Sequence, residues 1–297
     1  MMVSGPYLRM VMPPLGAHAP KIKVMNMSRI LRSAVAILST LLFVACPVFA
    51  ADIQVITSGA FAEALKLLAP EYEKQSPNKI IISYGSSMGA ATDSIPSRLA
   101  RDEKFDVLIL ARPALDGFVK SGVVQPNTRV DLVASVIGAA VKSGAQKPDI
   151  STVPALRQAL LNAKSVAYSA SASGTYLSSE VFPKLGIAEQ MSKTATRIFS
   201  ERVGKVVARG DAELGFQQVS ELISIEGIDY IGEIPAEVQQ TVLFSAGITS
   251  NATNLQASQD LIAFLASPAA APVIQKAGLK PVLPVLPWRL PTKLAQP

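Results

Sequence analysis

The sequence predicts an α/β protein. After residue 50, short runs rich in β-branched residues alternate with segments of helical periodicity. The run Phe105–Leu110 is nearly all apolar, which is typical of a parallel strand that is buried on both faces. Phe61, Leu65 and Tyr72 lie on one face of a predicted helix, directly after the strand-like run Asp52–Thr57. This alternation favours sheets that are covered by helices.

The individual elements follow from the same patterns. In the first half we expect strand 52–57, helix 61–72, strand 79–84, a helix through 95–99, strand 105–110, helix 114–120 and an apolar segment 130–141 that is a strand pair or a crossover. In the second half we expect helix 153–162, strand 165–168, helix 175–185, helix 203–210, strand 213–217, helix 219–224, strands 229–231 and 241–248, and helix 255–265. Thr152 followed by Pro154 is a helix start signal, and the prolines after residue 280 predict an extended tail.

The first fifty residues have the pattern of an export signal. Arg29 and Arg32 precede the apolar run 34–44, which is too short for a bilayer core that needs about twenty residues. The run ends at Val48-Phe49-Ala50, with small or apolar residues before a cleavage point. We expect a signal peptide and leader extension over residues 1–50 and a mature protein from Ala51.

Two alternatives to this cleavage remain open. Cys46 could be the acylated residue of a lipoprotein, although Phe43 stands where such signals usually have Leu. The apolar run could also stay attached as an N-terminal anchor helix.

Removing the leader changes the charge and the available chemistry. The chain has 28 Lys and Arg against 22 Asp and Glu, a net charge of +6. Five of the basic residues and none of the acidic ones lie in the first fifty, which leaves 23 against 22 and a net charge of +1. This near-neutral balance is no argument for nucleic-acid binding. The same segment contains Cys46 and His18, the sole Cys and His of the chain.

A mature chain without Cys or His excludes several classes of site. It can form no disulfide, no Cys/His zinc site and no Ser-His-Asp triad. No acidic run of the EF-hand type is present either, and we expect no metal and no cofactor.

Four loops between a predicted strand and the following helix are rich in small hydrogen-bonding residues. They are Thr57–Ala60, Tyr84–Gly89, Tyr168–Thr175 and Phe216–Gln218. In α/β folds ligands lie at the carboxyl ends of strands, where backbone N–H groups at helix N-termini favour a small anion. Each loop alone could simply cap a helix or form a turn. Together the four loops favour an anion site.

The predicted ligand contacts come from these loops and act by hydrogen bonding. They are Ser58, Ser86, Ser87, Ser171, Ser173, Gly174, Thr175 and Gln218. Arg112 follows the buried strand 105–110 and could fork onto a carboxylate, or it could be solvated at a loop edge. Glu63 and Asp93 are predicted in first turns of helices, where the helix dipole alone explains an acidic residue.

Five segments carry a family resemblance: Ile53–Phe61, Gly85–Ser87, Phe105–Ile109, Ala208–Phe216 and Phe264–Ala270. In these segments the sequence resembles the periplasmic substrate-binding proteins of ABC transporters, specifically the molybdate-binding-protein family. The resemblance implies a type II periplasmic-binding-protein-like fold, in which each of two lobes is a mixed sheet flanked by helices. It also implies two crossover hinge strands, which we place near residues 134 and 241. The first lobe would be 51–133 plus 242–283, the second 134–241, and the Pro-rich tail 284–297.

The same resemblance implies a periplasmic solute-binding protein that delivers a small anion to a membrane ABC permease. We expect a monomer that takes a molybdate-like oxyanion or an organic carboxylate, with no part for nucleic acid. Molybdate binders usually have Ser where this chain has Ala60, and commonly Tyr where it has Gln218. With Arg112 added to the site, these departures suit a carboxylate better than a tetrahedral oxyanion.

The family resemblance also implies an alternative activity, because one relative is an aconitate isomerase that moves a double bond without a metal or organic cofactor. Such chemistry removes a proton from carbon and returns it. Without His, the candidate bases are Glu63, Tyr84 and Tyr168. A signalling or adhesion module that kept the fold and lost transport is a third alternative.

Overall fold

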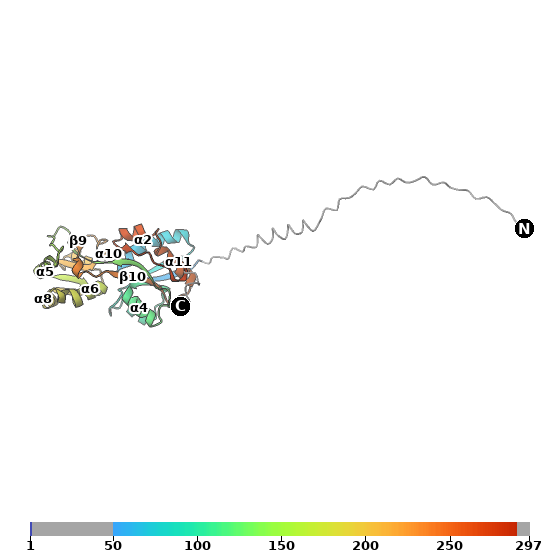
Figure 1. Cartoon of the computed structure of the whole chain (residues 1–297), viewed down its shortest axis with the longest axis horizontal. Helices are drawn as coiled ribbons and strands as arrows, with labels where there is room; N and C mark the ends of the chain where they lie inside the picture. Colours follow the sequence, from blue (N-terminus) through green and yellow to red (C-terminus); the bar gives the residue numbers. More distant parts are fainter. Residues whose placement is uncertain (2–49, 290–297) are drawn as a thin grey trace, which may run out of the picture. The chain divides into compact units, whose positions relative to one another are not determined.

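Two mixed β-sheets, each flanked by helices, organise the part of the chain that the computed structural model describes, Met1 and residues 50–289. The six-stranded sheet has the order β11-β4-β10-β3-β1-β2 and belongs to the first lobe. The five-stranded sheet has the order β7-β6-β8-β5-β9 and belongs to the second lobe. Figure 1 shows α2, α4 and α11 grouped around the first sheet and α5, α6 and α8 around the second. The predicted two-lobed α/β fold is confirmed.

The elements of the first lobe are β1 (Asp52–Thr57), α2 (Gly59–Gln75), β2 (Lys79–Tyr84), α3 (Ile95–Ala100), β3 (Val107–Ala111), α4 (Arg112–Lys120), β4 (Val130–Ser135), β10 (Val242–Ile248), α11 (Leu255–Leu265), α12 (Ala271–Lys276), β11 (Lys280–Pro281) and the 3₁₀ turn η3 (Pro287–Arg289). The elements of the second lobe are β5 (Ile137–Lys142), α5 (Val153–Asn162), β6 (Val166–Ser169), α6 (Ala172–Tyr176), the π-helical turn η1 (Leu177–Val181), α7 (Phe182–Lys184), α8 (Ala188–Thr194), β7 (Ala195–Ile198), α9 (Val203–Arg209), β8 (Leu214–Gln218), α10 (Val219–Leu222), β9 (Ile228–Glu233) and the 3₁₀ turn η2 (Ala236–Val238).

The core of the first lobe lies between its sheet and α2. β1 runs parallel to both of its neighbours, β2 and β3, whereas β10 runs antiparallel to β3 and β4. All five residues of β3 are buried, in agreement with its apolar sequence. Phe61, Leu65 and Tyr72 project from α2 into this core, on the face that the periodicity predicts. The parallel strands β1 and β2 therefore end on the same side of the lobe, and their loops lead into α2 and α3.

The second lobe repeats this plan with fewer strands. β6 runs parallel to β7 and β8, and β5 runs antiparallel to β8 and β9. Phe182 and Phe216 fill its main core. At the start of α5, the Thr152 side chain accepts a hydrogen bond from the backbone N–H of Ala155 at 3.3 Å, as the start signal predicts.

The chain passes between the lobes twice. β4 ends at Ser135 in the first sheet and β5 begins at Ile137 in the second, and the return runs from the end of β9 to the start of β10. Gln239, on the return segment, ties the two passages together. Its Oε1 accepts from the N–H of Ile137 at 2.9 Å, and its Nε2 donates to the Ile137 carbonyl oxygen at 2.8 Å. The two crossings of the predicted fold are present, while the lobe boundaries at 134 and 242 stay a prediction.

The structure differs from the predicted elements in the second half. The predicted elements do not include α8, β7 and α12, because these are too short for a clear periodic pattern. The predicted helix 175–185 is interrupted by a π-helical turn over Leu177–Val181, and the short helix α7 that follows has Pro183 in its first turn. At this turn the Ser178 hydroxyl donates to the carbonyl oxygens of Gly174 and Thr175, which a periodicity argument cannot foresee.

The end of the chain also differs from the predicted extended tail. Pro287–Arg289 form a 3₁₀ turn, and Leu286 and Trp288 pack against the core of the first lobe. Burying part of the large indole favours this contact over a solvated chain. The predicted signal peptide, with Cys46 and His18, lies outside the described residues. Between residues 50 and 289, every helix is too short or too polar to cross a membrane.

We predict that Asp106 is required for the stability of the first lobe. Its buried carboxylate accepts from the N–H of Gln54 at 2.8 Å and from the N–H of Thr253 at 2.7 Å, which joins β1 to the loop before α11. Because Asp106→Ala leaves both N–H groups without this acceptor, it should lower the free energy of unfolding by about 2–4 kcal/mol in a urea titration. Asp106→Asn, which keeps one acceptor oxygen, should lose less. An alanine variant as stable as the wild type would contradict this role.

Candidate functional site

A cleft of about 650 Å³ lies where loops of the two lobes face each other. From the first lobe, the loops that follow β1 and β2 line it. From the second lobe, it is lined by the connections that follow β6, β7 and β8. All four loops singled out in the sequence contribute residues to this cleft, because strand ends of both sheets point toward it.

Three polar side chains in the cleft are buried without a hydrogen-bond partner among the described residues. Ser58, Ser173 and Gln218 are 2%, 1% and 2% exposed, and the Ser58 hydroxyl, the Ser173 hydroxyl and both amide atoms of Gln218 are unpaired. Buried polar atoms in proteins are nearly always paired, because an unpaired one costs about 1–3 kcal/mol. Three such groups from three loops of one cleft indicate that a polar ligand supplies the missing partners.

Two further predicted serines, and Ala60, line the same cleft. The Ser86 hydroxyl donates to the carbonyl oxygen of Met88 at 2.8 Å, and the backbone N–H of Ser171 donates to the Ser169 hydroxyl at 2.9 Å. These hydrogen bonds hold the loops in shape and leave other donors of both serines available.

The remaining loop residues have structural contacts and do not line the cleft. The buried Ser87 hydroxyl accepts from the N–H of Ala111 at 3.0 Å. Gly174 packs on the backbone of Ser169 so closely that any Cβ there would overlap it. The Thr175 hydroxyl accepts from the Arg197 guanidinium at 3.1 Å.

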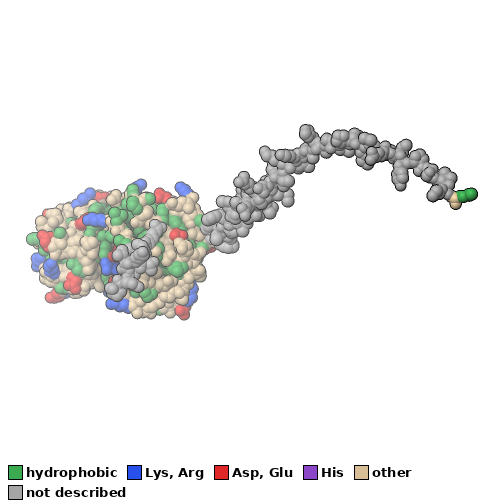
Figure 2. All heavy atoms as spheres, turned by 45° about the vertical axis from the view of Figure 1, so that its right-hand side comes forward, with side chains coloured by type: hydrophobic (Ala, Val, Ile, Leu, Met, Phe, Trp, Pro, Cys, Tyr) green, Lys and Arg blue, Asp and Glu red, His purple; other side chains and the backbone are tan. Residues whose placement is uncertain are grey.

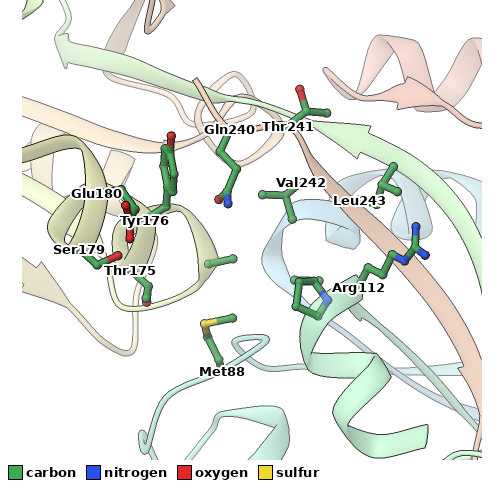
Figure 3. A pocket seen from close by; sticks show the side chains of 13 residues that line it. Met88, Arg112, Thr175, Tyr176, Ser179, Glu180, Gln240, Thr241, Val242 and Leu243 are labelled. Carbon is green, nitrogen blue, oxygen red and sulfur yellow. The ribbon is translucent and has the colours of Figure 1, made fainter. Parts of the chain in front are cut away.

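Arg112 lies outside the cleft. It is the first residue of α4 and lines a second pocket of about 410 Å³, together with Thr175. Its guanidinium pairs with the Asp131 carboxylate at 3.2 Å and approaches Asp116 at 3.8 Å. Figure 3 shows the guanidinium pointing away from the centre of this second pocket. The carboxylate that Arg112 binds in this structure is therefore a side chain of the same lobe.

The three candidate bases have different surroundings. Glu63 lines the cleft and lies 3.9 Å from Lys66, one turn further along α2. Tyr84 lines the cleft and is 49% exposed. Tyr168 lies outside it and packs edge-on against Phe182, with 5.7 Å between the ring centroids.

The sequence analysis missed the most deeply buried carboxyl of the cleft, Glu221. Its side chain is 8% exposed, and Gln217 Nε2 donates to its Oε1 at 2.9 Å. Burial raises the pKa of Glu221 to about 7, although the Arg202 charge and the Gln217 hydrogen bond act in the opposite direction. The sequence did contain a signal for Glu221 as a cleft residue, because it lies three residues after Gln218, in the first turn after a predicted ligand loop.

Charged side chains of both signs line the cleft. The basic ones are Lys66, Arg202 and Lys205, and the acidic ones are Glu63, Asp93, Glu201 and Glu221. Glu201 is held by the Arg209 guanidinium at 2.8 and 3.0 Å, which lowers the pKa of that carboxyl. Figure 2 shows acidic and basic side chains interspersed on the visible face. Within residues 50–289, no cluster of three or more acidic side chains could hold a metal ion.

Known proteins share this architecture and much of the sequence. A family model of bacterial extracellular solute-binding proteins matches residues 53–280. An aconitate isomerase from a Pseudomonas species is 44% identical over 249 residues, which cover 82% of this chain and 95% of that protein. The molybdate-binding protein of Azotobacter vinelandii is 26% identical, covering 79% of this chain and 92% of that protein.

A solved structure agrees with these matches. The periplasmic molybdate-binding protein of Azotobacter vinelandii superposes with a TM-score of 0.62 at 21% identity, over 78% of this chain and all of that chain. The matched fold, the extent of the family model and the cleft between two lobes together show that the chain belongs to the bacterial extracellular solute-binding protein family.

Proposed function

We propose that this protein captures a small organic anion with carboxylate groups in the cleft between its lobes, outside the cytoplasm. The observation that carries the proposal is the set of unpaired buried polar groups of Ser58, Ser173 and Gln218. A ligand that accepts from the two hydroxyls and from the amide Nε2 of Gln218, and that donates from a hydroxyl or protonated carboxyl to its Oε1, would satisfy them. The N-terminus of the 17-residue helix α2 adds a favourable dipole.

A carboxylate accounts for the cleft better than a tetrahedral oxyanion does. Lys66, Arg202 and Lys205 line the cleft and would stabilise more than one negative charge. The most similar of the relatives described above is named for aconitate, a tricarboxylate. We propose further that the protein is exported to the periplasm by the signal in its first fifty residues, acts as a monomer and delivers its ligand to an ABC permease.

A second candidate function, isomerisation of aconitate or a similar polycarboxylate, is favoured by Glu221. Moving a double bond along such a molecule removes a proton from one carbon and returns a proton to another. A buried carboxyl with a pKa of about 7 can do both near neutral pH. Molybdate capture needs no such group. The name of the 44% identical relative agrees with this second candidate.

We predict that carboxylates stabilise the exported protein against heat more than inorganic oxyanions do. Thermal unfolding would be followed with citrate, both aconitate isomers, molybdate, tungstate, sulfate and phosphate. A ligand at a hundred times its dissociation constant adds about 2.7 kcal/mol to the free energy of unfolding. Stabilisation by molybdate and tungstate alone would show an oxyanion binder, and no stabilisation by any anion would contradict the proposed function.

Incubation with cis-aconitate separates the two candidate functions. A capture protein leaves the compound unchanged, whereas an isomerase converts it to trans-aconitate, which chromatography resolves. This incubation uses the same protein preparation as the thermal unfolding measurement.

We predict that Ser58→Ala weakens ligand binding without lowering stability. The substitution removes a buried hydroxyl that has no partner in the described structure, so the free energy of unfolding should stay constant or rise by up to about 1 kcal/mol. The dissociation constant of the ligand should rise about tenfold, because a hydrogen bond to a charged group is lost. Ser87→Ala is the matched control, since that hydroxyl accepts from the N–H of Ala111 and its loss should lower stability instead. Equal behaviour of the two variants would contradict the assignment.

We predict that Arg112→Met leaves the dissociation constant of the ligand unchanged within about twofold. The guanidinium pairs with Asp131 and lies outside the cleft, so the ligand does not need it. Denaturation should show a loss of about 0.5–1 kcal/mol, as expected for a partly exposed ion pair. A tenfold loss of affinity in a calorimetric titration would place Arg112 in the binding site after all.

A further inference from the structure

Glu221 lines the cleft at a contact between the two lobes. The short helix α10 of the second lobe packs against α2 of the first, and the two lie side by side in Figure 1. The Glu221 carboxyl lies so close to Gly59, the first residue of α2, that a Cβ at position 59 would overlap its Oε1. The carboxyl therefore lies beside the N-terminus of α2, where the anion is proposed to bind.

The surroundings of Glu221 leave it without a cation in contact. Among the described residues, no Lys or Arg lies within 4 Å of its carboxylate oxygens, whereas Glu63 pairs with Lys66 and Glu201 with Arg209. Gln217 donates the one hydrogen bond that the structure shows to the carboxyl. On the other side of α10, the turn at Gly278 packs against Ser220 and Ile223, which are both uncharged.

The other charged groups of the cleft come from the neighbouring elements. They are Glu63 and Lys66 of α2, Asp93 before α3, Glu201 and Arg202 before α9, and Lys205 of α9. Burial raises the pKa of Glu221 to about 7, so the charge of this carboxyl changes in the neutral pH range.

An ionised Glu221 and a bound carboxylate would repel each other in this partly desolvated space. A protonated Glu221 would instead donate a hydrogen bond to the anion. Ligand entry and proton uptake by Glu221 are therefore expected to occur together.

We propose that Glu221 binds a proton when the anion enters the cleft and donates a hydrogen bond to it, which makes anion capture a proton-coupled event. The proposal rests on the proposed capture of a carboxylate. The proton comes from solvent, so the balance is protein plus anion plus one proton giving the complex. If the protein is an isomerase, the same group is placed to exchange a proton with the ligand.

Isothermal titration of the exported protein with citrate and trans-aconitate between pH 6 and pH 8 tests the proposal. With a Glu221 pKa of about 7, the affinity of the wild type should fall by about tenfold over this range. Glu221→Gln mimics the protonated carboxyl, since its amide can donate to the anion and accept from Gln217. This variant should bind about tenfold more tightly than the wild type at pH 8 and lose the part of the pH dependence that Glu221 causes.

Titrations in two buffers of different ionisation enthalpy count the protons directly. At pH 8 the wild type should take up about one proton more per anion than Glu221→Gln does, because the remaining uptake belongs to the ligand itself. Glu189→Gln, which changes a carboxyl that lies on α8 outside the cleft and pairs with Lys193, is the control and should behave like the wild type.

The outcomes separate this proposal from the proposed function. Equal proton numbers and equal pH dependence in the wild type and Glu221→Gln overturn the role of Glu221 while anion capture stands. If the wild type binds none of the anions at any pH, the proposed function fails and this inference fails with it. If turnover of cis-aconitate is observed, Glu221→Gln should lose about 10²- to 10⁴-fold in rate while it still binds, and full activity in that variant would contradict proton exchange by Glu221.

Discussion

The properties of the cleft depend on one feature, which is a set of buried polar atoms that have no hydrogen-bond partner in the described part of the chain. Ser58, Ser173 and Gln218 are buried between two well-packed lobes, and no described protein atom pairs with the polar atoms of their side chains. Such atoms destabilise the ligand-free protein, and the surplus stability must come from elsewhere. The two hydrophobic cores supply it, since each sheet is packed against helices by long apolar side chains. The cleft thus contains four of the buried side-chain atoms that lack a hydrogen-bond partner among the described residues.

The sequence predicts much of this arrangement because local patterns determine it. β1, β2, α5 and α11 begin and end at the predicted residues, since periodicity and capping are properties of neighbouring positions. Ser58, Ser173 and Gln218 were predicted to lie near one another because ligands of α/β folds lie at the carboxyl ends of strands, and both sheets direct such strand ends toward the cleft. Each of these predictions needed only the order of strands and helices.

The remaining site residues depend on contacts between distant segments. Arg112 was a reasonable carboxylate ligand, but Asp131 of strand β4 pairs with it, two strands away from β3 in the sheet. Thr175 is in turn bonded to Arg197. Glu221 gains its properties from burial against α2 of the other lobe, and no pattern in its own segment reports that contact. Charge pairing and burial between lobes follow from tertiary packing, which a local pattern does not contain.

Capture and isomerisation make similar demands on such a cleft. Both require that a polycarboxylate be held by hydrogen bonds and opposite charges, and both gain from closing two lobes over it. They differ in what happens to the proton near Glu221: a carrier returns it to solvent when the ligand leaves, whereas an isomerase passes it through the ligand. The fate of the proton at one buried carboxyl can therefore distinguish a transport protein from an enzyme on the same scaffold.

The pair of hydrogen bonds from Gln239 to Ile137 has a further consequence for binding strength. One side chain thus fastens the two passages between the lobes to each other. In a two-lobed protein that opens and closes, the observed dissociation constant is the intrinsic one divided by the closed fraction. Residues that never touch the ligand, such as Gln239, thereby help to set how much of it the protein holds at a given concentration.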